Sequence, residues 1–300
     1  MRPTRERSKF LDAETLQKIG SLDLIAREVV EGLRVGVHKS PLHGFSTEFV
    51  HHRQYAPGDN LRHIDWRVYG RTQRYYVKLY EAETNFDANL LLDASSSMRY
   101  GSGSVSKLEY AKYMIASLAY LIVHQHDSVG LGVFDSKLRR YLPPSGSPSI
   151  VHDIAHELEI AQPEPRTDIA DLLHQFALRL KRRGLVMLFS DLFDDIDKLV
   201  QGLEHLRFGG HNVAVFHILD PAELTFPFSG TCKFKGLEGV TELLTEPRRV
   251  QEAYLAELKK MIDRIRNACE RAHVDYVLVD TSRPVDEVLS AYLISRSRGV

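Results

Sequence analysis

The sequence is poor in cysteine and tryptophan. Its 300 residues include two cysteines, Cys232 and Cys269, and one tryptophan, Trp66. The cysteines stand far apart, which excludes a disulfide-stapled fold and a cysteine zinc site with paired spacing. We therefore expect a reducing compartment.

Long apolar runs are also missing. No segment approaches the ~18 consecutive apolar residues of a membrane-spanning helix, and the basic N-terminus MRPTRERSKFLDAETLQ is not followed by the apolar core of a signal peptide. We therefore expect a cytoplasmic location and no direct membrane span. Neither sign of charge is in excess, because 39 Lys and Arg residues face 40 Asp and Glu residues. Such a balance gives no global field that would attract nucleic acid or an anionic membrane.

What the sequence does contain is enough apolar material for a large core, with 43% hydrophobic and 26% charged residues. From Phe86 onwards, short apolar runs alternate with amphipathic segments. The runs predict strands at 88–92, 129–134, 138–142, 185–189, 213–219 and 276–279. The amphipathic segments predict helices at 107–124, 150–160, 168–182, 196–206, 248–271 and 285–295.

This alternation predicts an α/β fold with a doubly wound, mostly parallel sheet covered by helices on both faces. The runs 129–134 and 138–142 are too close for a crossover connection, so they predict one antiparallel edge hairpin. We expect residues 86–300 to form this domain. Residues 1–85 are expected to form an N-terminal helix, at 13–33, followed by an irregular accessory segment that ends in a strand at 75–83. A second irregular stretch is expected at 221–239.

The stretch NLLLDASSSM ends an apolar strand on an acid and three serines. Asp93, Ser95 and Ser97 place one carboxylate and two hydroxyls at a strand end, where parallel sheets collect ligands. Thr167, just before a helix, and Asp191, after the strand LVMLFS, stand at equivalent ends. Oxygen ligands of this kind suit a hard cation such as Mg²⁺. Because only the two acids are charged, a bound ion would stay positive and could accept a partner's carboxylate.

Each of these residues has a simpler explanation when it is taken alone. Serine and threonine can cap the helices that follow them, and acids are common at strand ends. The conjunction of matched positions at three sheet ends favours the metal site. We expect Asp93 to lie at the surface and to face the ion, not the core.

The same motifs resemble the metal-ion-dependent adhesion site of von Willebrand factor A-like domains. The resemblance is carried by DASSSM, the threonine of RTDIADLL, the aspartate of LFSDLFDD and the hairpin VGLGVFDSKLRRYLPP. It implies that Mg²⁺ or Mn²⁺ is bound by Asp93, Ser95, Ser97, Thr167 and Asp191. It also implies that the domain is a protein-binding module, not an enzyme. Leu192 follows Asp191 where a glycine is usual in that family.

An upstream block, GFSTEFVHHRQYAPGDNLRHIDWRVYGRTQRYYVKLYEAE, is similar to the domain of unknown function family fifty-eight. Its signature or partner-surface residues here are Glu48, Arg53, Tyr55, Gly58, Asp59, Arg62, Asp65 and Trp66. Members are bacterial or archaeal and are often encoded beside MoxR-type AAA+ ATPases. Many carry membrane helices before this block, and this chain resembles the short branch without them. The resemblance implies an adaptor or partner of such an ATPase in the assembly or maturation of other proteins.

An alternative function comes from five histidines around the same block, namely His38, His43, His51, His52 and His63. Together with the nearby acids they suggest a metal-dependent hydrolase. No pair has the helical spacing of a known zinc motif, so solvated or packed histidines account for them as well. GSGSVSKLEY lacks the glycine before Lys107 and the Ser or Thr after it that a phosphate-binding loop needs.

The block is also basic, with eight Lys or Arg against three acids between Arg34 and Lys78. A nucleic-acid surface, a face for an acidic protein partner and internal pairing, such as Arg62 with Asp65, each account for this surplus. We expect no nucleic acid. Trp66 is interpreted as a core anchor that pins the segment to the sheet.

Overall fold

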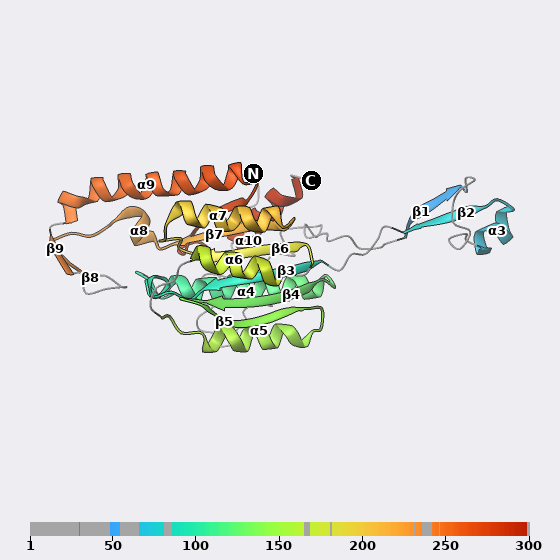
Figure 1. Cartoon of the computed structure of the whole chain (residues 1–300), viewed down its shortest axis with the longest axis horizontal. Helices are drawn as coiled ribbons and strands as arrows, with labels where there is room; N and C mark the ends of the chain where they lie inside the picture. The colour runs from blue at the N-terminus through green and yellow to red at the C-terminus, as the bar shows by residue number, and fades with distance from the viewer. Residues whose placement is uncertain are drawn as a thin grey trace, which may run out of the picture. The chain divides into compact units, whose positions relative to one another are not determined.

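The computed structural model describes residues 30, 49–54, 66–80, 86–164, 169–180, 182–230, 232–235, 242–245 and 247–298. The chain divides into two compact units, one of them Leu42–Phe86 and the other holding Asp87–Val300. Figure 1 draws the helices and strands of both, and each unit is described by itself. The predicted N-terminal helix lies outside the described residues, apart from the buried helical residue Val30.

The smaller unit is built on a two-stranded antiparallel sheet. Strand β1 (Phe49–Gln54) pairs with β2 (Tyr76–Tyr80), and the short helix α3 (Trp66–Thr72) lies between them in the chain. The sequence predicts a strand at 75–83, which β2 confirms in part, but it predicts irregular structure where β1 and α3 form. Pairing with the neighbouring strand, and not an alternation of apolar residues along the chain, accounts for the regular structure of this unit.

Trp66 does not anchor a core in this unit. Its side chain is 63% exposed, and its ring contacts Tyr69 edge-on at 6.1 Å. Tyr69 in turn stacks on Tyr75 at 4.5 Å. Trp66 is thus exposed within its own unit, and the prediction that it pins the segment to the sheet concerns the other unit and stays a prediction.

The larger unit contains a six-stranded sheet. Its strands are β3 (Asp87–Asp93), β4 (Ser128–Phe134), β5 (Leu138–Ser145), β6 (Gly184–Ser190), β7 (Asn212–Leu219) and β10 (Asp275–Asp280). They lie in the order β5-β4-β3-β6-β7-β10, and all neighbours are parallel except the antiparallel pair β4 and β5. This arrangement confirms the predicted mostly parallel α/β sheet with one antiparallel edge hairpin.

Helices follow most strands of this unit. They are η2 (Ser96–Arg99, a 3₁₀ helix), α4 (Lys107–His124), α5 (Ser149–Ile160), α6 (Ile169–Arg179), α7 (Ile196–Phe208), α8 (Pro221–Thr225), α9 (Pro247–Arg271) and α10 (Val285–Arg298). A small antiparallel pair, β8 (Cys232–Lys235) and β9 (Glu242–Thr245), precedes α9. The sequence predicts irregular structure at 221–239, where α8 and β8 form.

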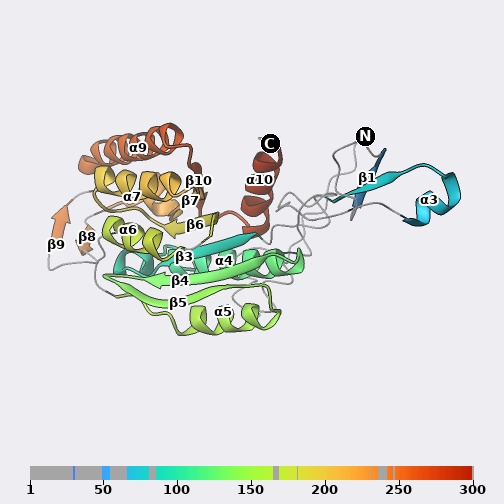
Figure 2. The same ribbon diagram turned by 45° about the vertical axis from the view of Figure 1, so that its right-hand side comes forward.

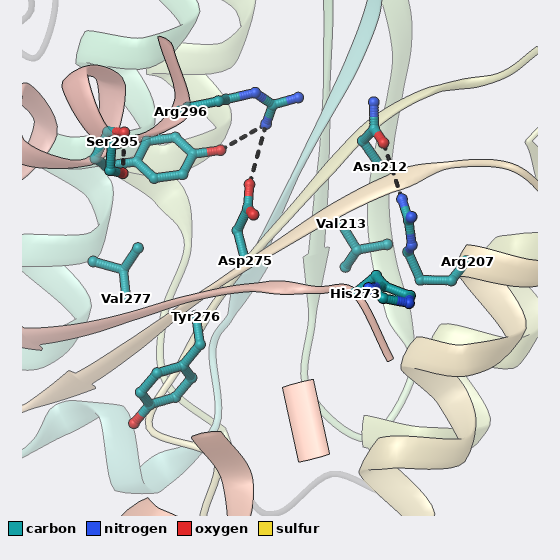
Figure 3. A pocket seen from close by; sticks show the side chains of 10 residues that line it. Arg207, Asn212, Val213, His273, Asp275, Tyr276, Val277, Ser295 and Arg296 are labelled. Atoms are coloured by element: carbon teal, nitrogen blue, oxygen red, sulfur yellow. Dashed lines mark hydrogen bonds and ion pairs between the residues drawn. The ribbon is translucent and has the colours of Figure 1, made fainter. Parts of the chain in front are cut away.

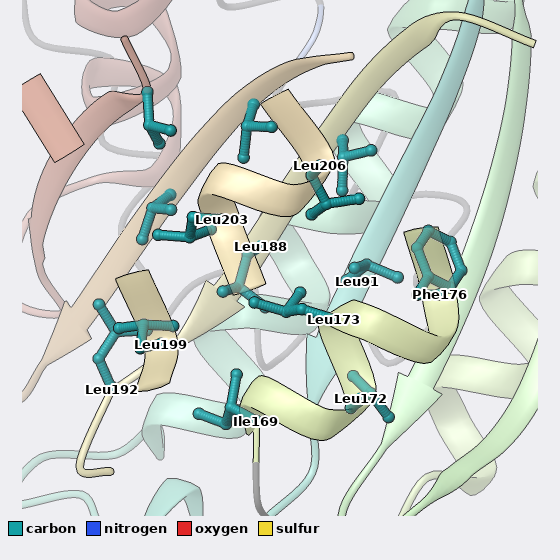
Figure 4. Packing of buried hydrophobic residues seen from close by; sticks show 14 of the residues in the cluster. Leu91, Ile169, Leu172, Leu173, Phe176, Leu188, Leu192, Leu199, Leu203 and Leu206 are labelled. Atoms are coloured by element: carbon teal, nitrogen blue, oxygen red, sulfur yellow. The ribbon is translucent and has the colours of Figure 1, made fainter. Parts of the chain in front are cut away.

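One face of the sheet packs against α6, α7 and α9 (Figure 4). Leu91 of β3 and Leu188 of β6 meet Leu173 of α6 and Leu203 of α7, and α9 adds Ile265. All five side chains are at most 1% exposed. Strands that are buried in this way are near-continuous apolar runs in the sequence, as the central strands are here.

The opposite face packs against α4 and α10. Phe189 and Phe216 stack with ring centroids 4.7 Å apart, and Tyr292 of α10 meets Phe216 edge-on at 5.0 Å. Leu90 and Leu92 alternate with the residues of the first face and are fully buried as well. Because both faces of the central strands are buried, their sequences do not alternate between apolar and polar residues as a half-exposed strand does.

The order of the strands reverses between β3 and β6 (Figure 2). From β3 the chain moves through β4 to β5, whereas from β6 it moves through β7 to β10 on the other side. The two strands are parallel neighbours, with Leu92 opposite Phe189. Their carboxyl ends therefore form the switch point at which open α/β sheets bind ligands.

Candidate functional site

Asp93 ends β3 at the switch point and is buried. It is 1% exposed, so the prediction that it lies at the surface is wrong. Its Oδ1 accepts the backbone N–H of Ser95 at 2.8 Å, and its Oδ2 accepts the hydroxyl of Ser190 at 2.6 Å. The sheet continues past it, since the N–H of Ala94 donates to the carbonyl of Phe134 at 2.7 Å.

The hydroxyls of Ser95 and Ser97 lie 3.0 Å apart in the turn after β3. Ser95 stands at the N-cap of η2, but its side chain makes no capping hydrogen bond. Ser106 caps the next helix, α4, by accepting the N–H of Glu109 at 3.2 Å. Helix capping therefore does not explain the orientation of the Ser95 side chain.

The electrostatics of Asp93 are unusual for a carboxyl group. Burial, and then the charge of Asp191, raise its pKa to about 7, against the lowering effect of the hydrogen bonds from Ser190 and Ser95. Two carboxylates in one buried place repel each other. A cation placed between the two carboxylates would relieve that repulsion.

Asp191 follows β6 and is held by a lysine. Its Oδ2 lies 2.8 Å from the Nζ of Lys107, which lies 2.7 Å from Oε1 of Glu223. Burial lowers the pKa of Lys107, but the charges of Asp191 and Glu223 raise it by more, so the ammonium stays charged. In the sequence, Lys107 stands in a stretch compared with a phosphate-binding loop, and nothing in that motif predicts this role. Its place at the first residue of α4, where the helix dipole disfavours a cation, is the signal that it needs acidic partners.

A second network joins the turn after β3 to α8. Asp220 accepts the hydroxyl of Ser102 at 2.5 Å and its N–H at 2.8 Å. Asp220 also caps α8 by accepting the N–H of Ala222, and its own N–H donates to Oε2 of Glu223 at 2.8 Å. Asp220 directly follows the predicted strand 213–219 and Glu223 lies in the stretch 221–239, so the apolar pattern points to neither. The sequence signal for both acids is the capping box of α8.

Leu192 has a backbone conformation that favours glycine. Its φ angle is 54°, in the left-handed region, and its side chain is fully buried among the residues of Figure 4. Its N–H donates to the hydroxyl of Ser190 at 3.0 Å. The leucine at this position therefore adopts a strained backbone conformation that glycine would adopt without strain. In return, its side chain is buried in the core.

Several predicted residues lie outside the described residues. They are Thr167, Glu48, Tyr55, Gly58, Asp59, Arg62 and Asp65, together with His38, His43 and His63. The backbone of Arg53, His51 and His52 runs in β1. Glu164, the last described residue before Thr167, donates its N–H to the carbonyl of Ala94 at 3.0 Å.

The donor set is not a cluster of classical transition-metal ligands. Within the described ranges, no three His, Cys, Asp or Glu side chains are grouped so that they could hold a metal ion. Asp93 and Asp191 supply two carboxylates, and Ser95 and Ser97 supply two hydroxyls. Hydroxyl and carboxylate oxygens fit Mg²⁺ or Mn²⁺ better than Zn²⁺.

A cavity of about 450 Å³ opens at the other end of the sheet, beside β7 and β10 (Figure 3). Arg207 donates to Oδ1 of Asn212 at 2.9 Å, and Arg296 lies 2.8 Å from the hydroxyl of Tyr292 and 3.7 Å from Asp275. Both arginines stand near the C-terminal ends of their helices, where the helix dipole favours cations. Helix stabilisation accounts for these charges without a ligand.

Comparison with known proteins identifies the family. Residues 51–264 match the family described as Protein of unknown function DUF58. The chain belongs to this family. A relative, the uncharacterized protein Mb1516 of Mycobacterium bovis, is 23% identical over 250 residues, which are 82% of this chain and 78% of that protein. The resemblance of the upstream block to family fifty-eight is thus confirmed, and this relative is bacterial, as predicted.

Solved structures resemble this member of the DUF58 family over most of its length. BatB from Bacteroides thetaiotaomicron is 21% identical, with a TM-score of 0.49, over 72% of this chain and 100% of that chain. An aerotolerance-related membrane protein from Bacteroides fragilis, with multiple mutations to serines, is 19% identical, with the same TM-score of 0.49 and the same coverage of 72% and 100%.

The cytoplasmic location predicted from the sequence does not stand, and the Bacteroides fragilis protein is a membrane protein by name. The prediction rested on the lack of long apolar runs, which tests for spanning helices and does not determine a compartment. In the part of the chain that the structure describes, no helix has the length and apolarity needed to cross a membrane.

Proposed function

We propose that this chain is a non-enzymatic, metal-dependent protein-binding module with a von Willebrand factor A-like domain. The observation that carries the proposal is the grouping at the switch point. There the hydroxyls of Ser95 and Ser97 lie 3.0 Å apart beside the buried carboxyl of Asp93. The strand order and the antiparallel pair at one edge support the fold part of the proposal.

Asp93, Ser95, Ser97 and Asp191 would hold Mg²⁺ or Mn²⁺, with Thr167 as the fifth residue. The ion would supply a positive centre with free coordination positions, to which a carboxylate of a partner protein binds. Neutral hydroxyls form half of the donor set in the described residues, so we expect weak and reversible binding of the ion. Weak binding suits a contact that must form and dissociate.

The non-enzymatic part of the proposal is supported by the surroundings of the serines. A nucleophilic serine needs a general base within hydrogen-bond reach. The hydroxyl of Ser95 contacts that of Ser97, and the carboxyl group beside them that could serve as such a base, Asp93, is assigned to the ion in this proposal. The proposal therefore expects no turnover of phosphomonoesters or phosphodiesters in Mg²⁺ or Mn²⁺.

The partner that we propose is a MoxR-type AAA+ ATPase, with the chain as its adaptor in the assembly or maturation of other proteins. This part rests on the family resemblance carried by the upstream block. The candidate metal site adds a chemical requirement, which is an accessible Asp or Glu on the surface of the ATPase.

Capture of the purified ATPase by the tagged full chain tests the proposal. We expect capture in Mg²⁺, loss of capture in chelator, and loss of capture by the double variant Ser95→Ala, Ser97→Ala in Mg²⁺. Ser147 and Ser149 provide a matched control, because their hydroxyls lie 2.9 Å apart with the same spacing in the chain but are exposed. Their double alanine variant should capture like the parent. Equal capture by all variants, with or without chelator, would refute the metal-dependent contact.

A further inference from the structure

Lys107 is a buried ammonium group beside the candidate metal site. The residue is 1% exposed, and its Nζ lies 2.8 Å from Asp191 and 2.7 Å from Glu223. The rings of Phe193 and Tyr100 are 5.0 Å and 5.9 Å from the same atom. Two carboxylates and two aromatic faces thus surround one positive charge.

The position of this lysine is costly in two ways. It is the first residue of α4, where the helix dipole repels a cation. Removing an ammonium group from water also costs several kcal/mol unless carboxylates compensate. A lysine is stable here because it neutralises Asp191 and Glu223, so its role is tied to those two acids.

Asp191 cannot bind the ammonium group of Lys107 and a divalent ion equally well at the same time. Its Oδ2 is bound to Lys107, and its Oδ1 accepts the N–H of Phe193 at a long 3.5 Å. An ion that takes Asp191 must share the carboxylate with the ammonium, and the two positive charges repel each other strongly where water is excluded. Glu223 offers the ammonium a second partner that belongs to another element, α8.

We propose that Lys107 is an internal cation of this site, which competes with a divalent ion for Asp191 and is retained by Glu223 when the ion binds. The inference rests on the metal site of the proposed function. It adds a regulated equilibrium to that site, in which Asp191 is paired with either the lysine or the ion.

The exchange would also link the ion to the turn after β3. Glu223 accepts the N–H of Asp220, and Asp220 holds both the hydroxyl and the N–H of Ser102. A shift of the ammonium towards Glu223 changes the charge balance of this network. Binding of the ion at Asp191 is thereby coupled to the turn that holds Ser102.

Calorimetric titration of the full chain with Mn²⁺ tests the competition. We expect Lys107→Met to bind Mn²⁺ at least about tenfold more tightly than the parent, because the competing charge is gone. Lys107→Gln keeps N–H donors for both acids and should also bind more tightly, which covers the case that the methionine variant does not fold. Lys112→Met is the matched control. That lysine is also buried in α4, at 4% exposure, but pairs with Glu109, and its loss should leave the affinity unchanged.

A double-mutant cycle separates competition from general charge effects. If Glu223 acts by retaining the lysine, Glu223→Gln should weaken Mn²⁺ binding about three- to tenfold in the parent and have almost no effect in Lys107→Gln. A similar loss in both backgrounds would assign the effect of Glu223 to its charge alone and would overturn its role as the second partner.

The remaining outcomes distinguish the two proposals. If the parent binds Mn²⁺ and neither Lys107 variant binds it more tightly, the internal-cation inference is wrong while the metal-dependent function stands. If the parent does not bind Mn²⁺ but Lys107→Gln does, the inference stands and the metal-dependent function of the parent is wrong. Absence of binding in all variants would overturn both.

Discussion

At the scale of single residues, the site is defined by carboxylates that the fold buries. Asp93 is 1% exposed and accepts hydrogen bonds from Ser95 and Ser190. Its neighbour Asp191 has a lysine as partner, whereas Asp93 has hydroxyl and amide donors. Of the two acids, Asp93 is therefore the one whose charge state the proposed cation would affect most.

Asp93 should make the metal-free protein less stable as the pH rises. Burial, followed by the charge of Asp191, raises its pKa to about 7 from 3.8. Between these values the folded protein binds a proton that the unfolded chain does not, so stability present below about pH 4 is lost as the pH rises to about 7. The loss amounts to at most about 4 kcal/mol.

Urea unfolding in chelator at several pH values measures this effect. Asp93→Asn keeps an acceptor for the N–H of Ser95 and carries no charge, so its stability should lack this component and exceed that of the parent at pH 8. Identical pH profiles for the two proteins would show that Asp93 does not titrate in this range.

Leu192 tests the balance between backbone strain and packing. Replacement by glycine relieves a left-handed backbone worth about 1 kcal/mol but removes a fully buried leucine side chain from the core, which costs about 2–5 kcal/mol. We expect Leu192→Gly to lower the free energy of unfolding by about 1–4 kcal/mol in denaturant titration. A glycine variant more stable than the parent would show that strain outweighs packing at this turn.

At the scale of elements, the turn after β3 and α8 are joined by Asp220. This side chain accepts two hydrogen bonds from Ser102 and caps a helix of five residues. A helix this short does not persist by itself. The connection therefore keeps α8, and with it Glu223, in place beside Lys107.

Asp220→Ala should lower the free energy of unfolding by about 2–4 kcal/mol, because the variant loses a cap and leaves the N–H of Ser102 without its acceptor. Asp195 is the matched control, since it caps α7 from an exposed position by accepting the N–H of Asp197 and Lys198. Asp195→Ala should cost about 1 kcal/mol. Equal costs in urea unfolding would show that the link to Ser102 adds nothing.

At the scale of the whole molecule, the parallel sheet brings distant segments to one edge. Asp93 and Asp191 are far apart in the chain but follow neighbouring strands, and Lys107 reaches them from the start of α4. A ligand at this edge therefore binds the folded chain and has little affinity for the unfolded one. Binding of the ion should consequently stabilise the whole larger unit.

Mg²⁺ should raise the unfolding temperature by mass action. At a concentration ten to a hundred times the dissociation constant, the gain is about 1.4–2.7 kcal/mol. The parent should show this gain in differential scanning calorimetry, and the double variant Ser95→Ala, Ser97→Ala should not. An equal shift in both would place the bound ion elsewhere on the molecule.

The apolar pattern of the sequence predicts most helices and strands of the larger unit. The helix at 107–124 matches α4, and the antiparallel hairpin follows from the short gap between β4 and β5. Asp93 is buried although its motif predicts a surface position, because the apolar pattern does not report how many neighbours cover a given side chain. Strand β1 depends on a pairing partner that lies later in the chain, β2, whereas the capping box of α8, Asp220 with Glu223, is local and is not part of the apolar pattern.

The sequence by itself determined the alternation of strands and helices, the membership of the family and the candidate oxygens at Asp93, Ser95, Ser97 and Asp191. Periodicity and motif spacing are local properties, and a single chain displays them without being folded. The tertiary structure alone decided that Lys107 stands between Asp191 and Glu223, because that contact joins three elements that are close only when the sheet has formed. The interaction of two charges depends on the distance between them in the folded protein, and the order of residues along the chain does not state that distance.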